Sequence, residues 1–172
     1  MMKFTVRQVF LVFVVFALVL GLLRGVQWIY MRSAIRSPLL HAMQSVTGVK
    51  KVEVSPQGAV TVFASRRANL MNVYQGIEAQ NRLVTGHVPT AITIVSHPSP
   101  AMLQSLNTLR LIIAQGEATG QYVAMNASIQ QVAKHDHFAA TVQISSRHIF
   151  VTLRAPQYWE DIVMPLRLGG QG

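Results

Sequence analysis

The longest run of apolar residues lies at the start of the chain. Residues 9–23 contain no charged side chain, and the apolar character resumes after Arg24 and continues to residue 31. The apolar side chains would surround a helix on every side, which is typical of a helix in lipid and not of one on a protein surface. A helix over residues 9–31 would be about 34 Å long, enough to cross a hydrocarbon layer of about 30 Å. The pattern predicts a transmembrane anchor at 9–31, preceded by a short tail at 1–8.

Three side chains near the end of this run are of the kind that lies at a membrane surface. Arg24 can extend its guanidinium to the headgroups, and Trp28 and Tyr30 carry the amphipathic rings that favour the interface. The basic start and the apolar run also resemble a cleaved export signal, but no small-x-small cleavage site follows. A buried core helix is the third alternative. We expect an uncleaved anchor.

Basic residues flank the predicted span on both sides. Lys3, Arg7 and the amino terminus precede it, while Arg24, Arg32 and Arg36 follow, and Arg24 belongs partly to the span. The positive-inside rule then favours an N-terminus in the cytoplasm, a single pass through the cell membrane and a C-terminal domain outside the cytoplasm. The inverted alternative is a cytoplasmic domain whose basic doublets face the anionic leaflet.

After a linker at 32–37, alternating and helical periodicities predict two similar stretches of chain. The first, at 38–97, reads as helix, hairpin, helix and strand, with the helices at 38–46 and 67–84, the hairpin at 50–65 around a Pro56–Gly58 turn, and the strand at 90–96. The second, at 98–165, reads as a helix from 101, a break at Gly116 and Gly120, a helix at 122–134, a hairpin of 138–144 with 148–154, and a short closing helix at 156–163. A flexible tail follows at 166–172.

These elements predict the α+β class. The helix–hairpin–helix order occurs twice, which indicates two tandem α-β-β-α units. The alternative is one small antiparallel or mixed sheet with helices on one face.

The first stretch resembles a known group of domains. A helix, the dipeptide GV, a V-x-V strand, a turn with glycine and a second short strand, then a helix and a strand, look like the αββαβ pattern of BON-type and ring-building envelope domains. The resemblance covers about residues 38–97. It implies a domain without catalytic residues that acts through contacts between subunits or with lipid, and it transfers no individual site residue.

Composition narrows the function classes. The formal net charge is +9, but from residue 37 onward ten Lys and Arg face six Asp and Glu, a net of +4, and the basic residues are scattered. A nucleic-acid partner would require them on one face, so none is expected. The chain has no cysteine, which excludes thiolate metal sites and thiol nucleophiles. Neither a phosphate-binding P-loop nor a G-x-S-x-G elbow is present.

The candidates for chemistry are few. His135 and His137 are two residues apart and would point to one side of a strand, where Asp136 could help them to hold a metal. The alternative is a polar turn between helix and strand. Glu117 is expected in a turn between helices, and Glu160 and Asp161 on a solvated helical face. We expect no enzymatic activity and no cofactor.

These observations predict a membrane-anchored assembly module. Its partners would be the lipid bilayer and either further copies of the chain or another cell-envelope protein. A membrane-bound metal-dependent sensor or enzyme, using the region of His135 and His137, is the alternative function.

Overall fold

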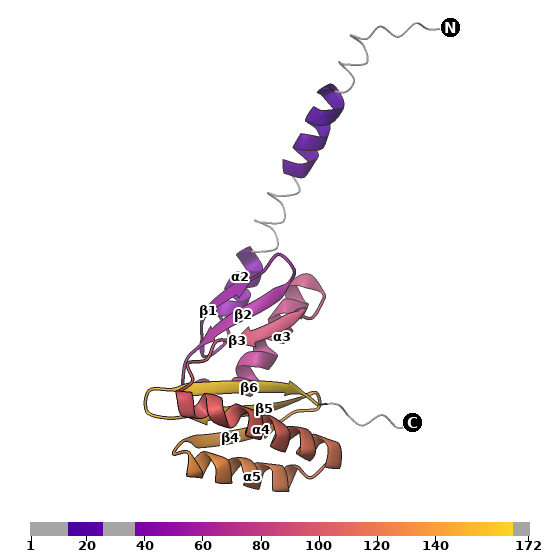
Figure 1. Cartoon of the computed structure of the whole chain (residues 1–172). Coiled ribbons are helices and arrows are strands. Elements are labelled where there is room, and N and C mark those ends of the chain that lie inside the picture. Colours follow the sequence, from indigo (N-terminus) through magenta and orange to yellow (C-terminus); the bar gives the residue numbers. More distant parts are fainter. Residues whose placement is uncertain (1–13, 26–36, 167–172) are drawn as a thin grey trace, which may run out of the picture.

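The computed structural model describes residues 14–25 and 37–166 (Figure 1). Within these residues the protein is a mixed α+β fold with five helices and two three-stranded sheets. After the helix at 14–25, the elements are α2 (Ser37–Gln44), β1 (Val49–Val54), β2 (Ala59–Ala64), α3 (Leu70–Thr85), β3 (Ala91–Ile94), α4 (Pro100–Thr119), α5 (Tyr122–His135), β4 (Ala139–Ile144), β5 (His148–Arg154) and β6 (Trp159–Pro165). The predicted α+β class is confirmed. The alternative of one single sheet is wrong, because the strands form two separate sheets.

The structure describes only part of the predicted anchor at 9–31. Residues 14–25 form a helix with every side chain exposed, and Arg24 lies near its end. Trp28, Tyr30 and the remaining residues of the 9–31 segment lie outside the described residues. Among the helices of residues 14–25 and 37–166, none has both the length and the apolar content required to cross a membrane.

The first sheet has the order β1-β2-β3, with β1 and β2 antiparallel and β2 and β3 parallel. Helices α2 and α3 cover one face of it (Figure 1). The predicted order of helix, two strands, helix and strand is thus observed. The buried side chains of this core come from both layers: Leu39, Met43, Val52, Val60, Val62, Val73 and Ile77.

Local signals explain the boundaries of these elements. Gly58 has a φ of 80°, which glycine adopts without steric cost, and it closes the β1–β2 turn. The Asn69 side chain accepts a hydrogen bond from the backbone N–H of Asn72 and so begins α3. Gly86, in the left-handed region with a φ of 77°, ends it.

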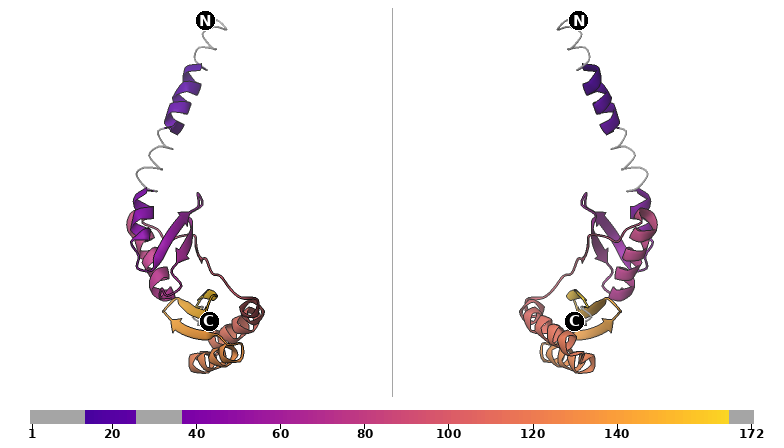
Figure 2. Two further views of the ribbon diagram at one scale, coloured as in Figure 1. Left: turned by 90° about the vertical axis from the view of Figure 1, so that its left-hand side faces the viewer. Right: turned by 90° about the vertical axis from the view of Figure 1, so that its right-hand side faces the viewer.

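The second sheet is an antiparallel meander in the order β4-β5-β6. Figure 2 shows α4 and α5 lying together on one side of it. Every second residue of β5, namely Ile149, Val151 and Leu153, is fully buried against these helices. Leu109, Ile113 and Ile129 are the largest fully buried side chains that the two helices contribute, together with Met102.

Two expectations for this half of the chain are wrong. The predicted closing helix at 156–163 is the strand β6, which pairs with β5 over seven residues from Trp159 to Pro165. Its apolar positions fit a helix as well as a strand, and the pairing with β5 decides between them. The prediction of a second α-β-β-α unit is therefore wrong, because the order in this half is helix, helix and three strands.

The other correction concerns Gly116, which lies inside α4 and does not break it. A Cβ atom there would come within 2.6 Å of the Met125 side chain, so the glycine allows α5 to approach α4 closely. Only Gly120, with a φ of 68°, ends the helix. Glu117 consequently lies in α4 and not in a turn.

Candidate functional site

The two sheets meet where α3 packs on the face of β5 that α4 and α5 leave open. The ring of Tyr74 in α3 lies edge-on to Phe150, with centroids 5.6 Å apart, and its centroid is 4.8 Å from that of the His148 ring. The Tyr74 hydroxyl is 3.4 Å from Nε2 of His148. Phe150 is buried, although its side chain is on the outer face of the sheet, because Tyr74 covers it.

Charged groups border this aromatic contact. An Nη of Arg147 donates to a carboxylate oxygen of Glu78 at 3.0 Å. Burial lowers the pKa of His148 below 6.5, against the opposing effect of Glu78. Burial, assisted by the charge of Glu78, raises the pKa of Tyr74 above 10.0. Both shifts favour neutral rings at the contact between the two sheets.

The loop between β2 and α3 makes the second contact. Its residue Arg66 donates from both terminal nitrogens to the backbone carbonyls of Ala155 and Pro156, in the turn between β5 and β6. Nε of Arg154 donates in return to the carbonyl of Arg66 at 2.9 Å. Two arginines thus connect the first unit to the second through main-chain carbonyls.

Arg154 is itself held by a buried carboxylate. Its Nη1 lies 2.7 Å from Oδ1 of Asp161, whose side chain is only 4% exposed. The same nitrogen donates to the carbonyls of Leu153 and Glu160. The expectation that Glu160 and Asp161 form a solvated helical face is therefore wrong: Asp161 is enclosed on β6, and burial raises the pKa of Glu160 above 4.5.

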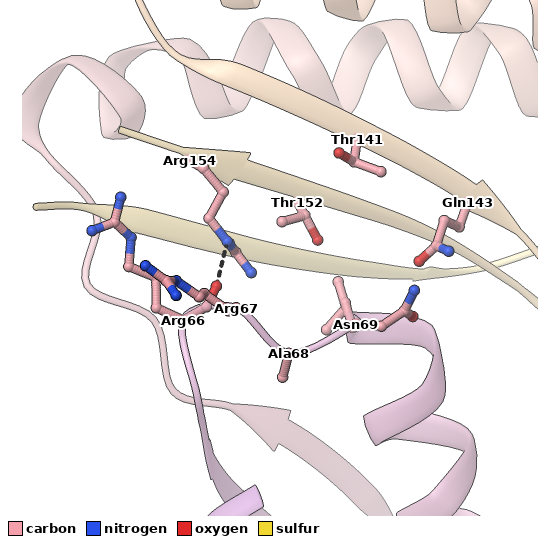
Figure 3. Close-up of a pocket in the computed structure, with 9 residues that line it drawn as sticks. Arg66, Arg67, Ala68, Asn69, Thr141, Gln143, Thr152 and Arg154 are labelled. Carbon is pink, nitrogen blue, oxygen red and sulfur yellow. Dashed lines mark hydrogen bonds between the residues drawn. The ribbon is translucent and has the colours of Figure 1, made fainter. Parts of the chain in front are cut away.

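A groove of about 490 Å³ lies beside these contacts (Figure 3). One wall is the loop and first turn of α3, and the other is the outer face of β4 and β5. Thr141 and Thr152 are direct cross-strand neighbours in that wall. The lining residues are Arg66, Arg67, Ala68, Asn69, Leu70, Thr141, Gln143, Thr152 and Arg154, so the part of the chain that the structure describes contributes three cations and no acidic side chain to the groove.

The predicted histidine site has a different geometry from the expected one. His135 ends α5, and His137 is in a turn with a φ of 59°, so the two do not share the side of a strand. Nδ1 of His135 lies 2.7 Å from Oδ1 of Asp136, and the Ser105 hydroxyl donates to the other oxygen of that carboxylate. These hydrogen bonds, that of Ser105 first, lower the pKa of Asp136 below 3.8.

This arrangement of serine, aspartate and histidine is not a catalytic triad. In a triad the imidazole lies between the hydroxyl and the carboxylate and takes the hydroxyl proton. Here Asp136 lies between Ser105 and His135, so the imidazole cannot act on the serine. Across the described residues, no group of three or more His, Cys, Asp or Glu is placed to hold a metal ion.

Sequence reasoning missed the residues that line and support the groove. In the sequence Arg66 is only one of two adjacent arginines, and Arg154 is the last residue of the predicted strand at 148–154. One signal was available: Arg154 and Asp161 lie on either side of a short turn between two stretches of β-forming residues, at a spacing that makes them diagonal neighbours on one face of a hairpin. The contact between Arg66 and the β5–β6 turn joins residues about ninety positions apart and has no local signal.

Comparison with known proteins gives no match: no family model fits the chain, and neither the curated proteins nor the solved structures include a detectably similar one.

Proposed function

We propose that the protein is a membrane-tethered assembly module of the cell envelope. In this proposal residues 9–31 hold the chain in the bilayer, and the α+β part outside the cytoplasm associates with further copies of itself through the free edge of β4. The observation that carries the proposal is the chemical character of that edge compared with the other sheet edges.

Three of the four edges have features that discourage pairing with another chain. The β1 edge carries Lys50, Lys51 and Glu53 and an irregular register. The β3 edge is only four residues long. The first half of the β6 edge is covered, because His97 forms a two-way backbone bridge with Trp159 and the Ser96 hydroxyl accepts from the Asp161 N–H, and the strand ends in Pro165. Charges, irregular register, short strands and covering segments are the means by which proteins prevent edge-to-edge association.

The β4 edge lacks such features. Its sequence AATVQI has no charge and no proline, and its six residues pair with β5 without a register shift. Backbone groups alternate in direction along a strand, and Ser145 donates inward to His148, so the groups of Ala140, Val142 and Ile144 point outward. The Gln130 side chain donates to the Ala140 carbonyl. Val142 and Ile144 then remain to pair with a partner strand.

A second copy of the same edge fits these two positions. Antiparallel pairing of Val142 with the partner's Ile144, and of Ile144 with the partner's Val142, would use both outward groups and obey two-fold symmetry. This register places Gln143 opposite its own copy, in a pair without mutual hydrogen bonds and with Cα atoms about 4.5 Å apart. The two meanders would then form one six-stranded sheet.

The helix at 14–25 supports the tether. Its large apolar side chains are all solvent-exposed, from Val14 at 45% to Leu23 at 62%. A helix that exposes apolar groups on every side is stable only where another apolar phase covers it. Confinement to a bilayer would also raise the effective concentration of the domain, so that a short edge contact suffices for association.

The edge is tested by adding a charge to it. Ile144→Lys, in the full-length chain in detergent, should shift the protein from dimer to monomer in analytical ultracentrifugation, because the two lysines would be diagonal neighbours on one face of the short contact. Val123→Lys is the control, since Val123 is 87% exposed and belongs to α5, not to the β4 edge. A monomeric wild type, or an Ile144→Lys variant that dimerises as the wild type does, contradicts the proposal.

The tether and its orientation are tested separately. The full chain should stay with membranes after an alkaline wash, and a C-terminal tag should be cleaved by protease added to intact spheroplasts. Release of the chain by the wash rejects the anchor, and protection of the tag rejects the orientation.

A further inference from the structure

The groove between the two units has an electrostatic imbalance that its structural contacts do not remove. Arg154 is neutralised by Asp161, at 2.7 Å. Arg66 donates to carbonyls, which carry no formal charge, and Arg67 is exposed without an ion pair among residues 14–25 and 37–166. Two positive charges therefore stand uncompensated at one wall of the groove. Protein walls of low dielectric constant concentrate such a field on an anion in the groove.

The opposite wall supplies hydrogen-bonding groups. The hydroxyls of Thr141 and Thr152 and the amide of Gln143 are on the outer face of the second sheet, and Figure 3 shows them facing the loop that carries the arginines. Asn69, at the start of α3, adds a further amide. Guanidinium groups bind the oxygens of phosphate in a planar, two-point geometry, which lysine does not provide.

The size and polarity of the groove restrict the ligand further. A volume of about 490 Å³ is in the range of sites for small organic molecules and exceeds what a bare phosphate ion fills. Among the described residues no aromatic ring lines the groove, so they offer a nucleobase no stacking partner. The hydroxyls and amides match the hydroxyl groups of a polyol.

We propose that this groove binds a phosphate ester of a small polyol, with the phosphate at Arg67 and at the N–H groups of Arg66 that do not donate to Ala155 and Pro156, and the polyol hydroxyls at Thr141, Gln143 and Thr152. Because the two walls belong to different units, a bound ester would hold the units together. The inference does not depend on the membrane tether or on the β4 edge. The same chemistry occurs in a free ester and in the headgroup of a glycerophospholipid.

The test uses the full-length chain in neutral detergent, with glycerol 3-phosphate as the soluble probe. Inorganic phosphate and glycerol, the two components of this ester, are measured separately for comparison. Glycerol 3-phosphate should raise the melting temperature and bind at least about tenfold more tightly than inorganic phosphate. Arg67→Gln should weaken this binding about tenfold, and Thr152→Val should reduce the preference for the ester over phosphate. Arg82→Gln, which removes an arginine of α3 outside the groove, is the matched control and should leave binding unchanged.

A lipid arm identifies the source of the ester. Mixed micelles with phosphatidylglycerol, compared with phosphatidylcholine micelles, should reproduce the Arg67-dependent stabilisation if the headgroup is the ligand. A response to glycerol 3-phosphate alone assigns the free ester. The proposal is overturned if neither probe stabilises the wild type, or if Arg67→Gln and Arg82→Gln weaken binding equally. The oligomeric state is measured separately, so failure here leaves the β4-edge proposal standing.

Discussion

Nη1 of Arg154 lies 2.7 Å from Oδ1 of Asp161, across the hairpin of β5 and β6, with the aspartate side chain 4% exposed and the arginine 19% exposed. The pair stands at the junction of the two units, because Nε of the same guanidinium donates to the carbonyl of Arg66. An enclosed ion pair of this kind fixes the geometry around it, since either charge alone would be costly to bury.

Removal of the aspartate charge should therefore destabilise the fold. Asp161→Asn keeps the shape of the side chain but leaves Arg154 without its counter-ion, and we expect a loss of about 3 kcal/mol in the free energy of unfolding. Glu53→Gln is the matched control: its pair with Lys51 is 54% and 62% exposed at the two side chains, so the loss should be below about 1 kcal/mol. Urea denaturation measures both, and equal losses would show that the enclosed pair has no special role.

His148 should make the contact between the units sensitive to pH. Burial lowers its pKa below 6.5 in the folded state, so the unfolded chain binds more protons between the two pKa values. The contribution of the neutral ring is complete above the unfolded value and is lost as the pH falls below it. Tyr74, Glu78 and Arg147 are the ionisable groups around the ring.

The measurement is the free energy of unfolding from about pH 7.5 to about pH 5.5 for the wild type and for His148→Gln. The wild type should lose stability over this interval more steeply than the variant. Glu160, whose pKa is raised, and Asp136, whose pKa is lowered, are present in both proteins. Their contributions to the pH dependence therefore cancel in the comparison. If the free energy of unfolding of the two proteins changed equally with pH, protonation of the His148 ring would not be coupled to folding.

Arg66 should hold the units together through geometry as well as charge. Its two-point donation to the carbonyls of Ala155 and Pro156 requires a planar guanidinium, so Arg66→Lys should loosen the contact nearly as much as Arg66→Ala. We expect faster amide exchange in the β5–β6 turn, above all at Ala155, whose N–H donates to the Tyr158 carbonyl, with little change in the β1–β2 hairpin. Full rescue by lysine would show that charge alone is sufficient.

Gly116 should be intolerant of a side chain. Its missing Cβ leaves room for the Met125 side chain, whose Cβ would lie 2.6 Å from the new atom. Gly116→Ala should cost roughly 1–3 kcal/mol from overpacking, partly offset by about 1 kcal/mol of improved helix propensity. Met125→Gly removes all three atoms that lie within 2.7 Å of the new Cβ, so adding it to Gly116→Ala should relieve the clash, and the two changes should be less than additive. A Gly116→Ala variant as stable as the wild type would show that the helices can separate at no cost.

The sequence was informative wherever an element is specified locally. Glycine at a φ of 80° or 77°, an asparagine cap and alternating valines give hairpins and helix ends that neighbouring residues decide. β6 could not be identified in this way, since the spacing of Trp159, Ile162 and Val163 suits both a helix and a strand. Pairing with β5, which is a tertiary contact, determines the outcome.

The candidate site was beyond local prediction for the same reason. The groove arises from a loop after β2 and the outer face of a sheet more than seventy residues later, and the contact of Tyr74 with Phe150 has no periodic signature. His135 and His137, the candidate metal ligands of the sequence, lie instead at a helix end and in a turn. Arg66 and Arg67, which in the sequence are only an adjacent pair of basic residues, give the groove its uncompensated charge.

The assembly proposal is tested most directly by a single disulfide across the β4 edge. The chain has no cysteine, so Gln143→Cys in the full-length protein introduces the sole thiol, and Val123→Cys provides the exposed control. In the predicted pairing the introduced thiol and its copy in the partner meet at a separation that a disulfide can span. Mild oxidation of washed membranes should give a covalent dimer with Gln143→Cys and little with Val123→Cys; no dimer, or equal dimer from both variants, would contradict pairing through β4.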